Sequence, residues 1–343
     1  MRPPLNPLTD PFGERLAPRH RRSLHLLGAL FRFESNSVRL LRLVEQAFAG
    51  LPRHRLGART PRLRVRLQLA PSQPRKSAAE PPPLKTWSGP GFLCGAMDRS
   101  NLAIIVPAQG SALVVISRDM LRHAYHARYE LIEFAVYVLA SRAQGLVPLH
   151  AAAVGHHGRA VLLMGDSGAG KSTIALHSLL QGLAMVSEDA VFVAPEQLLA
   201  TGIASFLHLR SGALRLLQRH ESAGRMRASP IIRRRSGAEK REVDLRRTGY
   251  RLAPAALRIK AVIFLSRRTA SDDRLLIPVA ARALARRLVV HQPYAATQHG
   301  WHRFEKKLAG VRAFELRRGT HPRVAVAALC DLLALPERRA RRA

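Results

Sequence analysis

The clearest pattern of hydrophobic positions lies near the middle of the chain. Residues 160–164 (AVLLM) form a continuous apolar run, which is typical of a strand that is buried on both faces. Residues 150–155 (HAAAVG) predict a second strand, and residues 156–158 (HHG) predict the tight turn that joins the two. Residues 173–180 then predict a helix. The expected order is therefore an antiparallel hairpin, a loop and a helix.

Two acidic residues separate the next two apolar runs. Residues 184–187 and 190–193 are each long enough for a short strand, and Glu188 and Asp189 lie between them. We expect these carboxylates to emerge at a strand end, beside the loop that precedes the helix over 173–180. Carboxylates in such a place can hold a metal ion or accept a proton.

The N-terminal third has patterns of its own. Apolar residues at helical spacing predict a helix over residues 38–48, and strict alternation predicts a strand over 62–69 with one wet, basic face. Residues 102–106 and 112–117 predict a hairpin. The proline-rich residues 71–91 predict a loop or linker.

A long helical pattern over residues 119–144 is expected to join the N-terminal part to the rest. The arginine-rich residues 220–242 predict a mobile loop over the site. The remaining patterns predict strands over 259–265 and 311–316 and helices over 280–290, 296–308 and 323–335. We therefore expect an α/β protein with an N-terminal α+β region (1–118), a second domain (119–336) and a basic tail (337–343).

Charge raises the question of a polyanionic partner. The 343 residues carry a formal net charge of +33, with 56 Lys and Arg against 23 Asp and Glu. The arginines are scattered and only 5% of the residues are aromatic, so the composition does not favour nucleic acid as the partner. Cys94 and Cys330 lack the spacing of a disulfide framework or a zinc site. No apolar stretch near the N-terminus is long enough for a membrane anchor, so we expect a cytoplasmic location.

The loop between the strand and the helix carries a phosphate-binding motif. Its sequence, GDSGAGKS, matches the pattern G-x-x-x-x-G-K-[ST] in full. Glycines let backbone N–H groups surround the phosphates, Lys171 adds positive charge, and Ser172 can place its hydroxyl on Mg²⁺. The motif predicts ATP and Mg²⁺ as cofactors, bound by Gly165, Asp166, Ser167, Gly168, Ala169, Gly170, Lys171, Ser172 and Thr173. We expect Lys171 to lie at a solvated junction between loop and helix.

These segments together resemble a known family. His150, the motif and the pair Glu188-Asp189 fall at positions that match the HPr kinase/phosphorylases and, more closely in overall organisation, the bacterial HPr kinase-related proteins. The resemblance is specific over residues 146–194 and generic to about residue 335. It implies the P-loop kinase core that these kinases share with the phosphoenolpyruvate carboxykinases.

The chain also departs from the family. Glu188 stands where those enzymes usually have Asp, Thr173 stands where they usually have Glu, and their later signature segment has no counterpart. The resemblance implies a kinase and leaves its substrate open. A serine or threonine on a small protein or peptide is the acceptor we expect.

The predicted catalytic residues are His150, Lys171, Glu188 and Asp189. By resemblance, Glu188 is the candidate base for the incoming hydroxyl, and Asp189, with Ser172, is the candidate metal ligand, although the sequence does not decide which acid has which role. His150 is expected to orient the acceptor or the transferred phosphoryl group. The alternative is a nucleotide-binding regulatory or assembly module with little kinase activity, which the arginine content favours. Neither reading requires a membrane, and both leave a homo-oligomer open.

Overall fold

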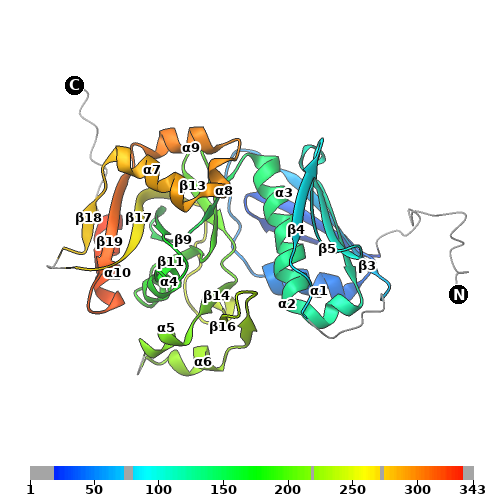
Figure 1. Cartoon of the computed structure of the whole chain (residues 1–343), viewed down its shortest axis with the longest axis horizontal. Helices are drawn as coiled ribbons and strands as arrows, with labels where there is room; N and C mark the ends of the chain where they lie inside the picture. Colours follow the sequence, from blue (N-terminus) through cyan, green and yellow to red (C-terminus); the bar gives the residue numbers. More distant parts are fainter. Residues whose placement is uncertain (1–18, 73–79, 218–219, 271–273, 335–343) are drawn as a thin grey trace, which may run out of the picture. The chain divides into compact units, whose positions relative to one another are not determined.

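The computed structural model describes residues 19–72, 80–217, 220–270 and 274–334, and in them the chain forms an α/β structure with three β-sheets (Figure 1). The chain divides into two compact units. The described residues up to 24, 29–49 and 61–143 form the first unit, and those within 25–28, 50–60 and 144–343 form the second. The predicted basic tail, residues 337–343, lies outside the described residues.

A seven-stranded sheet forms most of the first unit, in the order β1-β2-β3-β7-β6-β5-β4. β2, β3 and β7 are parallel neighbours, whereas β7, β6, β5 and β4 pair antiparallel. The predicted strand over 62–69 and the predicted hairpin over 102–117 are confirmed. The strands are β1 (His20–Leu26), β2 (Ala29–Ser35), β3 (Arg62–Ala70), β4 (Lys85–Gly89), β5 (Phe92–Asp98), β6 (Asn101–Val106) and β7 (Ser111–Ser117), with a 3₁₀ turn, η1 (Pro107–Gln109), before β7.

β4 corrects the prediction that residues 71–91 form a loop throughout. Its side chains are mostly exposed, and backbone pairing with β5 holds it at the edge of the sheet. No apolar alternation was therefore needed to make this strand, and none signalled it.

Helices pack on the sheet of the first unit. The predicted helix over 38–48 is confirmed as α1 (Val38–Phe48). Residues 119–144 are helical as predicted, but as four successive pieces: η2 (Asp119–His123), α2 (Ala124–His126), the π-helical η3 (Ala127–Glu133) and α3 (Phe134–Gln144). Buried Leu131 and Ile132 belong to η3, which contacts α1, β6 and β7. This segment therefore belongs to the first unit, and the boundary lies near residue 143 rather than 118.

The second unit is built on a nine-stranded sheet. Its main path is β11-β9-β10-β17-β13-β12-β8; β19 also pairs with β17, and β18 pairs with β19. β10 and β17 are parallel, and the predicted hairpin of β9 with β10 is confirmed. The strands are β8 (Val147–His150), β9 (Ala152–His156), β10 (Arg159–Met164), β11 (Ala184–Ser187), β12 (Ala190–Ala194), β13 (Leu199–Gly202), β17 (Leu257–Thr269), β18 (Leu276–Pro278) and β19 (Arg312–Arg318).

Helices cover both faces of this sheet. Alternate residues of β10 enter two separate cores: Val161 and Leu163 pack with α4 (Lys171–Leu180) and α10 (Pro322–Ala334), whereas Leu162 and Met164 pack with the helices on the other face. Those helices are α7 (Ala281–His291), α8 (Pro293–Ala296) and α9 (Trp301–Leu308). A strand that is buried on both faces needs a continuous apolar run, which is why β10 was predictable.

Two predictions about single elements need correction. Residues 150–155 are two strands, because His150 ends β8, which pairs with β12, whereas β9 begins at Ala152 and pairs with β10 and β11. The predicted helix over 296–308 is α8 and α9 with a break between them. No helix in the described part of the chain is long and apolar enough to cross a bilayer.

The predicted mobile loop over 220–242 instead contains regular structure. Its described residues form α6 (Ala223–Ala228), β15 (Ile231–Arg233) and part of β16 (Glu239–Asp244). β16 pairs with β14 (Phe206–Leu209) and β15 in a three-stranded sheet, with α5 (Ser211–Arg215) beside it and the 3₁₀ turn η4 (Leu245–Arg247) after it. Backbone pairing orders this segment despite its polar side chains.

Candidate functional site

The glycine-rich loop, residues 165–172, connects the end of β10 to the start of α4. Gly165, Gly168 and Gly170 have φ angles of 154°, 81° and 108°, a region that side chains disfavour. A Cβ atom on Gly165 would lie 3.2 Å from Cβ of Leu265 in β17. Open space surrounds Gly168 and Gly170. The glycines therefore give the loop its turn and let other groups approach its backbone.

Lys171 folds back over the loop instead of extending into solvent. Its Nζ donates to the carbonyl oxygen of Gly165 at 2.6 Å and lies 3.5 Å from that of Asp166. Only 8% of the residue is exposed, so the expectation of a solvated junction is wrong. Burial lowers the pKa of Lys171 from its ordinary value, and the carboxylates around the pocket oppose this shift. The amine nevertheless lies on the inner side of the loop, where a bound anion would meet it.

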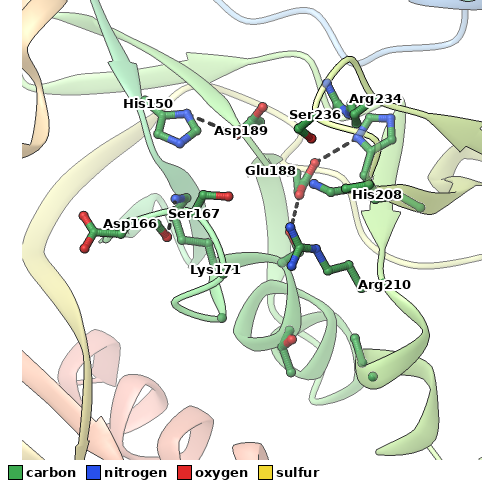
Figure 2. Close-up of a pocket in the computed structure, with 18 of the residues that line it drawn as sticks. His150, Asp166, Ser167, Lys171, Glu188, Asp189, His208, Arg210, Arg234 and Ser236 are labelled. Atoms are coloured by element: carbon green, nitrogen blue, oxygen red, sulfur yellow. Dashed lines mark hydrogen bonds and ion pairs between the residues drawn. The ribbon is translucent and has the colours of Figure 1, made fainter.

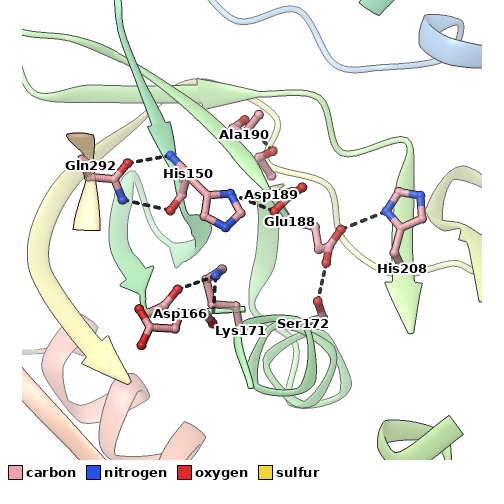
Figure 3. A network of polar contacts seen from close by, with 11 residues as sticks. His150, Asp166, Lys171, Ser172, Glu188, Asp189, Ala190, His208 and Gln292 are labelled. Carbon is pink, nitrogen blue, oxygen red and sulfur yellow. Dashed lines mark hydrogen bonds and ion pairs between the residues drawn. The ribbon is translucent and has the colours of Figure 1, made fainter. Parts of the chain in front are cut away.

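Glu188 follows β11 and is buried beneath the start of α4. Its Oε1 accepts a short hydrogen bond from the hydroxyl of Ser172, and its Oε2 lies 3.0 Å from Nδ1 of His208 (Figure 3). Glu188 is 5% exposed and His208 is 6% exposed. Burial opposes a charge on His208, but the hydrogen bonds to Glu188 and Glu242 outweigh it and raise the pKa of the imidazole.

Asp189 lies in the opposite environment. Half of its side chain is exposed, and its Oδ1 is 3.2 Å from Nδ1 of His150, which is itself 57% exposed. Partial burial opposes ionisation of the carboxyl. The hydrogen bond from His150 and the positive charges of Arg234 and Lys240 outweigh that effect and hold the pKa of Asp189 well below its usual range.

A buried glutamine holds the backbone of His150 in place. Oε1 of Gln292 accepts from the His150 backbone N–H at 2.7 Å, and Nε2 of Gln292 donates to the His150 carbonyl oxygen at 2.9 Å (Figure 3). Gln292 is 3% exposed and lies between α7 and α8. On the other side, β8 pairs His150 with Ala190 of β12. The histidine is thus fixed from two directions.

These residues surround one pocket of about 440 Å³ (Figure 2). The predicted His150, Glu188 and Asp189 line it, as does the glycine-rich loop except for Gly165 and Ala169. The basic side chains on the other wall belong to Arg210, at the end of β14, Arg234, after β15, and Lys240, on β16.

Sequence reasoning did not single out four residues of this site: His208, Gln292, Arg234 and Lys240. His208 lies between the apolar residues of β14, and Arg210 follows the strand, which is a weak signal of a strand with polar side chains. Arg234 and Lys240 were within the segment predicted to cover the site. Nothing in the sequence around Gln292 indicated a contact 142 residues away.

The donor set suits a magnesium ion that arrives with a nucleotide. Among the described residues, no group of three or more His, Cys, Asp or Glu side chains could hold a metal ion alone. Mg²⁺ in phosphoryl-transfer sites typically uses one or two carboxylates, a loop hydroxyl, phosphate oxygens and water. Ser172, Glu188 and Asp189 provide that protein share, and the Ser172–Glu188 hydrogen bond already brings two of these groups together.

Comparison with known proteins identifies no family. No protein-family model matches the chain, and no curated protein does. Among solved structures, the HPr(Ser) kinase/phosphatase from Coxiella burnetii is similar at 13% sequence identity, with 54% of this chain and 94% of that chain covered and a TM-score of 0.29. This likeness is too weak to carry an argument about function, which therefore depends on the site itself.

Proposed function

We propose that this protein is an ATP-dependent kinase that transfers the γ-phosphoryl group to a serine or threonine hydroxyl on a small protein or peptide. The observation that carries the proposal is a single pocket in which a complete phosphate-loop motif faces two carboxylates and a histidine. A nucleotide-binding site alone needs the loop. The exposed pair of His150 and Asp189, which lines the same pocket, adds groups suited to an acceptor hydroxyl.

The chain's own groups supply most of what phosphoryl transfer requires. Backbone N–H groups of the glycine-rich loop would surround the phosphates, and Lys171 would move from the Gly165 carbonyl to the β- and γ-phosphates. Ser172 and one of the two acids would hold Mg²⁺, which supplies charge neutralisation at the phosphate oxygens when it is bound. Arg210 and Lys240 line the same pocket and would add positive charge near the transferred group.

The surroundings of the pocket suit an acceptor larger than a metabolite. A second pocket of about 410 Å³ adjoins the first and shares Lys240 with it. Leu209, Leu214 and Ile231 form its apolar lining, and arginines surround them. A polypeptide whose hydroxyl enters the first pocket would find room and apolar contact in the second.

Calorimetric titration with Mg·ATP tests the nucleotide part of the proposal. We expect micromolar-range binding and at least a tenfold weaker Kd for Lys171→Ala, or about 1.4 kcal/mol, because the variant loses the cation at the phosphates. Since Lys171 is buried, a thermal melt must show that the variant is folded. Equal affinity of a folded variant and the parent would remove the phosphate-loop assignment.

The net charge of +33 favours a second candidate, a nucleotide-binding regulatory or assembly module associated with nucleic acid. Transfer of labelled phosphate to candidate proteins and peptides, measured with and without DNA or RNA, separates the two. Phosphorylated serine or threonine without nucleic acid supports the kinase. ATP binding without transfer, together with salt-resistant and sequence-selective binding of nucleic acid, supports the module.

A further inference from the structure

A polar network of four side chains runs from the glycine-rich loop into the three-stranded sheet. Ser172 begins the network on α4, Glu188 follows after β11, and His208 lies on β14 (Figure 3). Glu242 lies on β16. Nε2 of His208 is 3.7 Å from Oε1 of Glu242. The side chains of Glu188, His208 and Glu242 are 6%, 6% and 11% exposed, so little water reaches this polar network.

From this arrangement, and resting on the proposed function, we infer that Glu188 is the carboxylate at the metal and that His208 and Glu242 are the positioning residues that hold it there. Both oxygens of Glu188 are engaged, Oε1 by the very hydroxyl that the motif assigns to Mg²⁺. Asp189 is then the carboxylate that faces the acceptor, with His150. This exchanges the two roles that the family resemblance implies.

Burial supports this exchange. A base for an incoming hydroxyl must be reached by that hydroxyl, and Glu188 lies under α4 with its two oxygens already bonded. A metal-binding carboxylate benefits from a second hydrogen bond, because that bond fixes which oxygen faces the ion. Asp189 is half exposed and opens on the pocket, so an acceptor can approach it.

A role in stabilising the fold alone explains the polar network less well. β14 and β16 are already joined by backbone pairing from Phe206 to Leu209, so the sheet does not need the histidine. Buried ionic groups stabilise proteins little, and apolar residues of similar size often serve as well or better. The polar network ends at Ser172 in the loop motif, and this residue connects the network to the proposed metal site.

The test compares the affinity of ADP in Mg²⁺ with its affinity in EDTA, by calorimetry, so it does not depend on catalysis. His208→Leu should lose about tenfold or more of the gain in affinity that Mg²⁺ gives, with the affinity in EDTA changed less than twofold. His208→Asn, whose amide can replace Nδ1 as a donor, should retain most of that gain. Glu242→Gln should lie between them, and Glu221→Gln, an exposed residue before α6, is the matched control.

Asp189→Asn completes the experiment. We expect it to leave the gain from Mg²⁺ within about threefold of the parent. Loss of the gain in Asp189→Asn, with the gain intact in folded His208→Leu, would overturn the inference and restore Asp189 as the metal ligand. Failure of the parent to bind ADP under either condition would instead remove the proposed function, and the inference with it.

Discussion

Glu188 and Asp189 are neighbours in the sequence, but their side chains differ in exposure and in partners. On the loop side, Lys171, Ser172 and Glu188 are buried or bonded to one another. In contrast, His150 and Asp189 are each at least half exposed, and Nδ1 of His150 lies 3.2 Å from Oδ1 of Asp189. Phosphate and metal sites require fixed groups in a dry environment, whereas an acceptor must enter and leave. Under the proposed function, the buried groups would hold the nucleotide and its metal, and the exposed pair would meet the acceptor.

The largest effect should come from replacing each of the two acids, in separate variants, by its amide. Asp189→Asn should reduce phosphoryl transfer by roughly a hundredfold or more while ATP affinity stays within a few-fold, because its carboxylate acts on the acceptor. Glu188→Gln should weaken both Mg·ATP binding and transfer. Single-turnover rates and calorimetric Kd values for the two variants check this. The same pattern in both variants would contradict the division of the pocket.

His177 is a buried polar residue that differs from Ser172 on the same helix. His177 lies on α4 like Ser172, but it is 1% exposed and neither ring nitrogen has a hydrogen-bond partner. Burial, with His321 and Arg323 nearby, lowers the pKa of His177 to about 4. The unfolded chain binds this proton more readily, so stability is fully present above about pH 6.5 and falls as the pH drops toward 4, by roughly 3 kcal/mol.

Denaturant unfolding of His177→Leu at a series of pH values checks this. Relative to the parent, the variant should gain stability between pH 7 and pH 4.5. His299 is exposed, so His299→Leu is the control and should gain no stability relative to the parent over this pH range. A constant difference between parent and His177→Leu across this range would mean that His177 is not the buried neutral group that the structure indicates.

The smallest effect concerns the support of the acceptor side. Gln292→Ala should reduce the transfer rate about tenfold at unchanged ATP affinity, because the His150 backbone loses two hydrogen bonds and the imidazole its fixed place. Gln298→Ala removes another buried glutamine, which bonds to Tyr294 instead, and should leave the rate unchanged. Equal rates in all three proteins would show that the clamp does not matter to the reaction.

The sequence predicted what depends on local pattern. β10 is a continuous apolar run between two helical layers, and the loop after it follows a motif whose residues are adjacent, so both could be recognised directly. β4 was missed because its edge position requires only backbone pairing. Residues 220–242 were assigned to a loop because their side chains are mostly polar and carry no apolar alternation. Backbone pairing of β16 with β14 and with β15 orders the strands of this segment, and such pairing leaves no side-chain pattern.

For the candidate site, too, the sequence indicated the residues that lie close together along the chain and missed those that are distant. His150, the loop and the acidic pair lie within 40 residues, and the structure places them in one pocket. His208 and Gln292 reach the site through contacts over 20 and 142 residues, which no spacing rule covers. The burial of Lys171 was also not predictable, because it depends on the carbonyl of Gly165 that the loop turns toward it.

The contact between Gln292 and His150 uses only the backbone of residue 150. The glutamine is therefore indifferent to which side chain that position carries. A protein with this architecture can exchange the imidazole for another group without losing the fixed place from which it acts. The contact with Gln292 thus constrains position 292 but not the side chain at position 150, so a change in acceptor chemistry during evolution would be expected to alter the histidine and preserve the glutamine.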